Sequence, residues 1–174
     1  MLTRFTLAGV AVLGAAALAS SAASARTFTS YGFAATGIET GVPANDVSPF
    51  AGTAVGTGGV AVWNAHVQHA CGDSLNPDDA DITGGDFSLA GTQGVRLGGT
   101  FTGGHVLGFC APQAQCANQS YTIDDATLVL TDALGNTLTG TFDGTLTHYS
   151  RKILGTCVTY FATISGRLAA TPGP

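Results

Sequence analysis

The segment from Thr137 to His148 alternates two kinds of side chain with a period of two. Its odd positions carry Thr or Asp143, and its even positions carry Leu, Phe, Gly or His148. Because successive side chains of a β-strand point to opposite faces, this pattern predicts a strand with one hydroxyl-rich outer face and one face turned to a core. It excludes a helix. Gly140 and Gly144 lie on the core-facing side and favour a strongly curved sheet.

Other strand-like segments recur between Gly-containing turns, and no segment has the pattern of an amphipathic helix. Strands are expected at 27–35, 60–71, 87–90, 95–102, 105–110, 121–123, 127–131, 136–150 and 156–168. The Gly-rich stretch 36–59 is expected to be a long loop with at most a short strand at 53–55. The sequence therefore predicts an all-β, single-domain antiparallel β-barrel or β-sandwich of about eight or nine strands, stapled by disulfides. The inward glycines favour the barrel.

The first residues have the pattern of a secretory signal. Arg4 precedes a charge-free apolar run, and Ala23-Ser24-Ala25 has the small-x-small pattern of a cleavage site. We expect a cleavable signal peptide at 1–25, one β domain at 26–170 and a frayed tail at 171–174. The protein is then secreted, in an extracellular or periplasmic space, and no membrane span remains after cleavage.

Four cysteines follow this leader: Cys71, Cys110, Cys116 and Cys157. In an oxidising compartment they are expected to form two disulfides. Three connectivities are open. The short spacing favours Cys110–Cys116 at a hairpin tip, which leaves Cys71–Cys157 as a long-range staple.

Charge excludes two classes of protein. Only 10% of the residues are charged and 45% are hydrophobic, which is unlike a disordered chain. The net charge is −5 and there is no basic cluster, so nucleic acid is not an expected partner.

Histidine supplies the first candidate site. His66 and His69 are three residues apart, which places them on opposite faces of a strand and argues against a two-histidine metal site. His148 lies on the core-facing side near the end of its strand, where a polar group needs a partner. We predict ligand-binding roles for His148, Tyr160 and His69.

Asp79, Asp81 and Asp86 lie in an acidic stretch that offers the oxygen ligands calcium requires. The spacing imitates only the start of a calcium loop, because Ala90 stands where a bidentate Glu is needed. Calcium is the one cofactor that the sequence suggests.

No nucleophile elbow, phosphate-binding loop or zinc-protease motif is present in the sequence. The favoured function is therefore a secreted, non-enzymatic binding or cell-surface protein, with a small molecule or a cell-surface component as partner. The alternative is a small barrel that encloses an apolar ligand and has isomerase- or cyclase-type activity through His148 and Tyr160. An apolar pocket of about 300 Å³ or more would favour the second, and a solid core with an exposed apolar patch the first. Self-association through the edge of the 137–147 strand is a further expectation.

Overall fold

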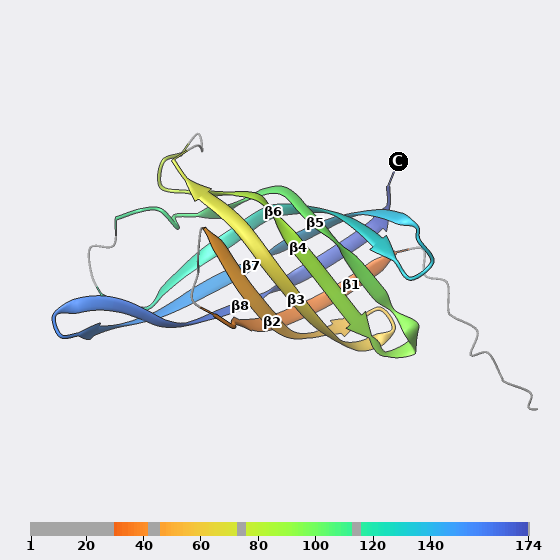
Figure 1. Ribbon diagram of the computed structural model, residues 1–174, viewed down its shortest axis with the longest axis horizontal. Coiled ribbons are helices and arrows are strands. Elements are labelled where there is room, and N and C mark those ends of the chain that lie inside the picture. The colour runs from red at the N-terminus through yellow and green to blue at the C-terminus, as the bar shows by residue number, and fades with distance from the viewer. Residues whose placement is uncertain (1–29, 42–45, 73–75, 113–115, 174) are drawn as a thin grey trace, which may run out of the picture.

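The computed structural model describes residues 30–41, 46–72, 76–112 and 116–173, and these form one closed barrel (Figure 1). The predicted signal peptide lies outside the described residues. The eight strands, with one short 3₁₀ turn at Thr92–Gly94 before the fifth, are β1 (Tyr31–Glu39), β2 (Val47–Gly56), β3 (Gly59–Cys71), β4 (Ala80–Gly91), β5 (Arg96–Leu107), β6 (Gln119–Asp132), β7 (Thr137–Ile153) and β8 (Thr156–Pro172).

Each strand pairs antiparallel with its neighbours in sequence, and β1 closes the barrel by pairing with β8. The all-β, antiparallel, disulfide-stapled prediction is confirmed, and the structure decides for the barrel over the sandwich. Closure gives each barrel strand a partner on both sides, so the 137–147 segment has no free edge there.

The prediction of a long loop at 36–59 is wrong, because most of this stretch forms the end of β1 and all of β2. Two of its glycines allow close packing between strands instead of forming a loop. A Cβ on Gly37 would lie 2.5 Å from Cζ2 of Trp63, and one on Gly52 would meet the Thr36 backbone. The Trp63 indole N–H lies 3.2 Å from the carbonyl oxygens of both Thr36 and Thr53.

Several predicted short strands are continuous in the structure. The segments 95–102 and 105–107 merge into β5, and 121–123 and 127–131 merge into β6, with irregular pairing near Gly103 and between Ile123 and Ala126. Residues 108–110, predicted as the end of a strand, belong to the connection after β5. Bulges of this kind absorb a turn-like residue without ending the strand. The C-terminal tail also extends the sheet further than predicted, since Thr171 pairs with Thr139.

The alternation from Thr137 to His148 is confirmed. Leu138 and Leu146 are buried, whereas Thr139 and Thr145 are exposed. Gly144 pairs with Gly166, and a Cβ on Gly144 would lie 2.3 Å from the Ser165 carbonyl oxygen. The inward glycine therefore lets two backbones approach closely, as the sequence predicted.

The core fills the barrel with side chains from every strand. The least exposed large residues are Leu128 and Leu130 on β6. Trp63 stacks on Phe87, and Phe87 meets the edge of Phe101 at a centroid distance of 6.4 Å. Aromatic packing of this kind stabilises a core beyond the area it buries.

All four cysteines are paired, but the favoured connectivity is wrong. The disulfides are Cys71–Cys110 and Cys116–Cys157. The chain after β5 does not turn back at a hairpin tip. It reaches β3 at Cys71 and then the β7–β8 hairpin at Cys157, so adjacent cysteines in sequence serve different strands. Two such bonds indicate an oxidising, extracellular-type compartment. No helix in the described part of the chain is long and apolar enough to cross a membrane.

The barrel has two unlike ends, at opposite ends of its long axis (Figure 1). At the turn end, short connections at 57–58, 92–95 and 133–136 join the strands. At the mouth, the connections 40–46, 72–79 and 108–118 are longer, and both disulfides lie there.

Candidate functional site

An apolar cavity of about 60 Å³ lies inside the barrel. Ser48 and His69 are its polar lining residues, and both lie toward the mouth. The rest of the lining is apolar and combines aliphatic side chains with aromatic ones, among them Phe33, Phe50, Trp63, Phe87, Phe101 and Phe142. The volume is several times the ~10–15 Å³ that one water-sized group occupies, but it is below the size of a pocket for a bulky ligand.

The polar groups at the mouth form a short series. Ser48 Oγ lies 3.3 Å from Nε2 of His69, and the Ser48 hydroxyl also hydrogen-bonds the Glu39 carboxyl. Ser48 is buried because it points inward from β2, two residues before the core residue Phe50. A carboxyl, a hydroxyl and an imidazole therefore meet where the apolar cavity ends.

Burial shifts the pKa values of the titratable groups at the mouth. Desolvation raises the pKa of Glu39, although the hydrogen bond from Ser48 opposes this. Desolvation lowers the pKa of His69, and the nearby Asp46 carboxylate opposes it. The pKa of His148 is lowered by desolvation and by His69. Each shift favours the neutral form of the group.

Phe109 closes the mouth as an aromatic plug. Its ring centroid lies 5.2 Å from those of His69 and Tyr121 and 5.5 Å from that of His148. Tyr121 and His148 also meet each other at 5.3 Å. Phe109 lines the cavity, whereas Tyr121 and His148 do not.

Both sides of the 108–118 connection are anchored. The Asp79 carboxylate accepts a 2.7 Å hydrogen bond from the Gly108 N–H, directly before the plug. Cys110 follows the plug and is bonded to Cys71. On the other side, Cys116 is bonded to Cys157, and the Asn118 side chain accepts from the Ser150 N–H. The plug is therefore held by covalent and polar contacts from three strands.

The structure separates the predicted ligand-binding residues. His69 lines the cavity, and His148 contacts the plug that covers it. Tyr160 does not line the cavity. It lies exposed on the β7–β8 hairpin, with the Arg151 guanidinium 4.9 Å from its ring centre.

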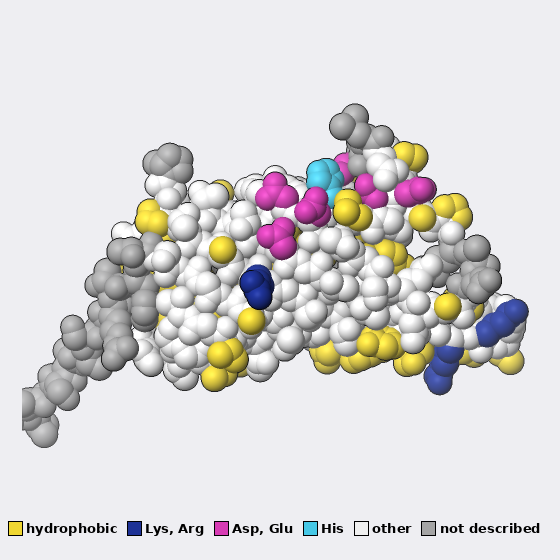
Figure 2. All heavy atoms as spheres, turned by 180° about the vertical axis from the view of Figure 1, so that it is seen from behind, with side chains coloured by type: hydrophobic (Ala, Val, Ile, Leu, Met, Phe, Trp, Pro, Cys, Tyr) yellow, Lys and Arg dark blue, Asp and Glu magenta, His cyan; other side chains and the backbone are white. Residues whose placement is uncertain are grey.

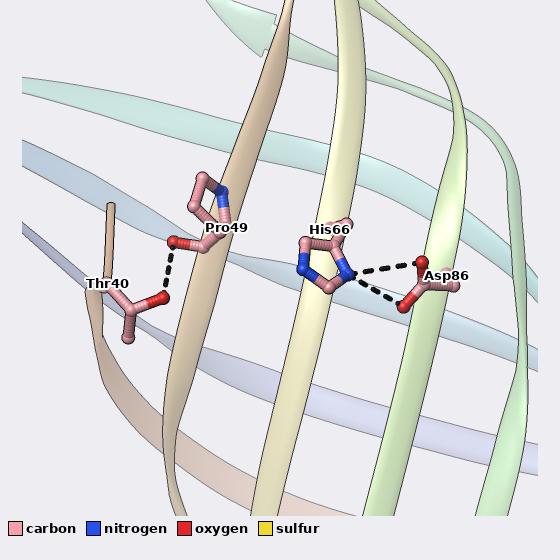
Figure 3. Close-up of polar contacts among 4 residues, drawn as sticks. All are labelled: Thr40, Pro49, His66 and Asp86. Atoms are coloured by element: carbon pink, nitrogen blue, oxygen red, sulfur yellow. Dashed lines mark hydrogen bonds and ion pairs between the residues drawn. The ribbon is translucent and has the colours of Figure 1, made fainter. Parts of the chain in front are cut away.

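The three aspartates of the predicted calcium site have different partners. Asp79 anchors Gly108, Asp81 pairs with His105 at 2.8 Å, and Asp86 pairs with His66 at 3.0 Å. Figure 3 shows the His66–Asp86 pair on neighbouring strands, and the Thr40 side-chain hydroxyl beside the Pro49 carbonyl oxygen that accepts its hydrogen bond. No group of three or more metal-ligating side chains occurs within the described ranges. His66 and His69 do face opposite sides, as predicted.

Sequence reasoning missed Glu39, Ser48 and Phe109. The first two fell in the stretch predicted as a loop, although Ser48, Phe50 and Ala54 follow the period of two that indicates a strand. Phe109 carried no signal beyond its place beside Cys110.

An apolar strip also lies on the outside of the barrel. Val55 and Val60 are paired across β2 and β3, and Val62 follows two residues later; all three are more than half exposed.

Comparison of the chain with protein-family models, curated proteins and solved structures gives no match.

Proposed function

We propose that this protein is a secreted binding protein for a slender amphiphile. The apolar chain of the ligand enters the barrel, and its polar head lies at Glu39, Ser48 and His69. The observation that carries the proposal is an apolar cavity whose polar groups gather at one end. Ligand sites are typically apolar, with a few polar groups that fix orientation.

The cavity size narrows the ligand class. A volume of about 60 Å³ is too small for a ring system or a branched ligand and suits the end of an unbranched chain. The Ser48 hydroxyl and the His69 imidazole can each donate or accept a hydrogen bond, which favours a head that does both, such as an alcohol.

The test uses Trp63, the only tryptophan of the chain, which lines the cavity. Straight-chain alcohols of increasing length are titrated while Trp63 emission and binding heat are recorded. Each added methylene is expected to tighten binding about fourfold, from ~0.8 kcal/mol per CH₂, until the cavity is full. Affinity that is independent of chain length contradicts the proposal.

Ala65→Leu fills the cavity, because Ala65 is buried in its lining. The matched control is Ala90→Leu, which adds the same side chain to an exposed position on β4. Ala65→Leu is expected to abolish the Trp63 response while the control retains it. Circular dichroism of both variants checks that the barrel is intact, since overpacking costs about 1–3 kcal/mol.

The second candidate function is assembly on a surface or with another copy of the chain, and the outer strip of Val55, Val60 and Val62 favours it. Sedimentation at several concentrations tests it. A concentration-dependent size that disappears in Val55→Thr/Val62→Thr supports assembly, and a monomer throughout contradicts it.

A further inference from the structure

The β7–β8 hairpin projects beyond the barrel at the mouth. Pairing of β6 with β7 ends at His148, and pairing of β1 with β8 ends at Thr163. The two hairpin strands continue to pair with each other as far as Ile153 and Thr156. Figure 1 shows this extension reaching past the other strands. We call residues 149–161 the tip hairpin.

The surface of the tip hairpin combines exposed apolar side chains with positive charge. Its exposed apolar residues are Ile153, Leu154, Val158, Tyr160 and Phe161. Arg151 and Lys152 lie beside them, and the sequence has no Asp or Glu after Asp143. Figure 2 shows basic side chains at the projecting end and the acidic ones gathered away from it on the barrel. The basic pair Arg151-Lys152 of this acidic protein therefore lies beside an exposed apolar tip.

Leu154 has no role in folding that explains its presence. Its side chain is 102% exposed, and its φ of 49° lies in the left-handed region. Gly155 follows with a φ of 87°. A two-residue hairpin turn with positive φ at both positions favours Asn, Asp or Gly, and a leucine there is strained. Strain kept at an exposed apolar residue points to a function outside the fold.

We propose that the tip hairpin docks this protein on an anionic lipid bilayer. Leu154 and Ile153 enter the boundary between headgroups and acyl chains, and Arg151 and Lys152 contact the lipid phosphates. Apolar side chains flanked by basic ones are the features that bind a protein to an anionic membrane surface. A narrow projecting tip suits a bilayer, which accommodates any convex shape, better than a protein partner, which would need a matching groove.

The Cys116–Cys157 disulfide ties the tip hairpin to the 108–118 connection, so docking places the barrel mouth near the bilayer. This inference goes beyond ligand binding and does not depend on it, because the docking residues do not line the cavity.

The test is flotation of the full mature chain with vesicles of phosphatidylcholine alone or with phosphatidylglycerol added. Binding is expected only to the anionic vesicles, and 1 M salt is expected to weaken it by screening the charges. Arg151→Gln/Lys152→Gln should lower the partition coefficient about 20- to 30-fold, from a factor of about five for each basic side chain. Leu154→Asn should lower it about tenfold or more through the lost apolar contact.

The controls lie at the other end of the barrel. Leu134→Asn removes an exposed leucine from the 133–136 turn, and Arg96→Gln removes an exposed positive charge beside the turn end. Both are expected to bind vesicles like the unchanged protein. Leu154→Asn also keeps the test clear of misfolding, because Asn suits the left-handed position and should leave the melting temperature equal or higher.

Four results would overturn the proposal: no binding to anionic vesicles, equal binding to both vesicle types, undiminished binding of Leu154→Asn, or equal losses in the turn-end controls. A dimer that Leu154→Asn dissociates, without vesicle binding, would assign the tip hairpin to a second copy of the chain instead. Loss of alcohol binding has no bearing on this result, so failure of the two proposals is distinguishable.

Discussion

The two ends of the barrel are built from the same strands but are stabilised differently. At the turn end, the Asp132 carboxylate accepts hydrogen bonds from the backbone N–H groups of Leu134 and Asn136 and from the Asn136 side chain. The Tyr31 hydroxyl donates a further, longer bond of 3.4 Å. Burial alone would raise the pKa of Asp132, but these bonds lower it. The turn end is therefore closed by local hydrogen bonds that satisfy a buried charge.

At the mouth, covalent bonds replace local turn contacts. Two disulfides hold the long connections, and the groups between them are titratable or aromatic. Glu39, Ser48 and His69 are also partly removed from water, but they make fewer hydrogen bonds than Asp132 does. Local hydrogen bonds therefore stabilise the turn end, whereas cross-links at the mouth offset the desolvation cost of the polar groups there.

The largest expected effect comes from removing the cross-links. Each disulfide closes a loop of about 40 residues, for which chain entropy predicts about 4 kcal/mol. Cys71→Ala/Cys110→Ala should lower the melting temperature by about 8–16 °C, measured by thermal circular dichroism. Hydrogen exchange should show the mouth losing protection first, with the amides of the 133–136 turn little changed.

Cys116→Ala/Cys157→Ala is the matched control, since its loop has nearly the same length but its bond is further from the plug. It should cost similar stability while leaving Phe109 anchored through Cys110. Equal loss of protection at both ends in either variant would show that the ends are not independent.

A smaller loss of stability is expected when one polar residue at each end is truncated. Asp132→Ala removes the shared acceptor of three part-buried turn hydrogen bonds at once and should cost about 2–4 kcal/mol, from about 1 kcal/mol for each bond. Ser48→Ala removes a hydrogen bond to a half-buried imidazole that water can still reach, and should cost about 1 kcal/mol or less. Urea unfolding measures both.

The same pair separates stability from function. Ser48→Ala is expected to weaken alcohol binding, because its hydroxyl lies at the polar end of the cavity. Asp132→Asn, which keeps the shape of the side chain, should leave alcohol binding unchanged. If Ser48→Ala costs as much stability as Asp132→Ala, the mouth is as much a structural element as the turn end.

The sequence predicted the pattern within single strands better than the contacts between segments that are distant in the chain. Alternation in the strand from Thr137 onward follows from local geometry, and so do the face of His148 and the role of Gly144. The stretch 36–59 was misread because its glycines are explained only by neighbours from other strands, such as Trp63 at Gly37 and the β1 backbone at Gly52. Disulfide pairing and the plug depend likewise on where 108–118 lies in space, and spacing along the chain does not contain that information.

The smallest effect is pH dependence that originates at the mouth. Burial lowers the pKa values of His69 and His148 below the ordinary value of about 6.5. The unfolded chain therefore binds protons more readily than the fold does, and the stability that comes from the neutral rings is full above about pH 6.5 and lost as the pH falls. The raised pKa of Glu39 acts with the opposite sign but in a lower window, near its own ordinary pKa.

Lowering the pH from 7.5 to 5.5 should therefore reduce the melting temperature, by only about 1–2 °C because both rings are partly exposed to screening water. His69→Gln/His148→Gln should remove this dependence, while His66→Gln/His105→Gln, which changes two exposed histidines paired with aspartates, should not. Hydrogen exchange at pH 5.5 should show loosening at 108–112 before the 133–136 turn. If the pH response persists in His69→Gln/His148→Gln, it originates outside the mouth. The two ends would then not differ in how their stability depends on pH.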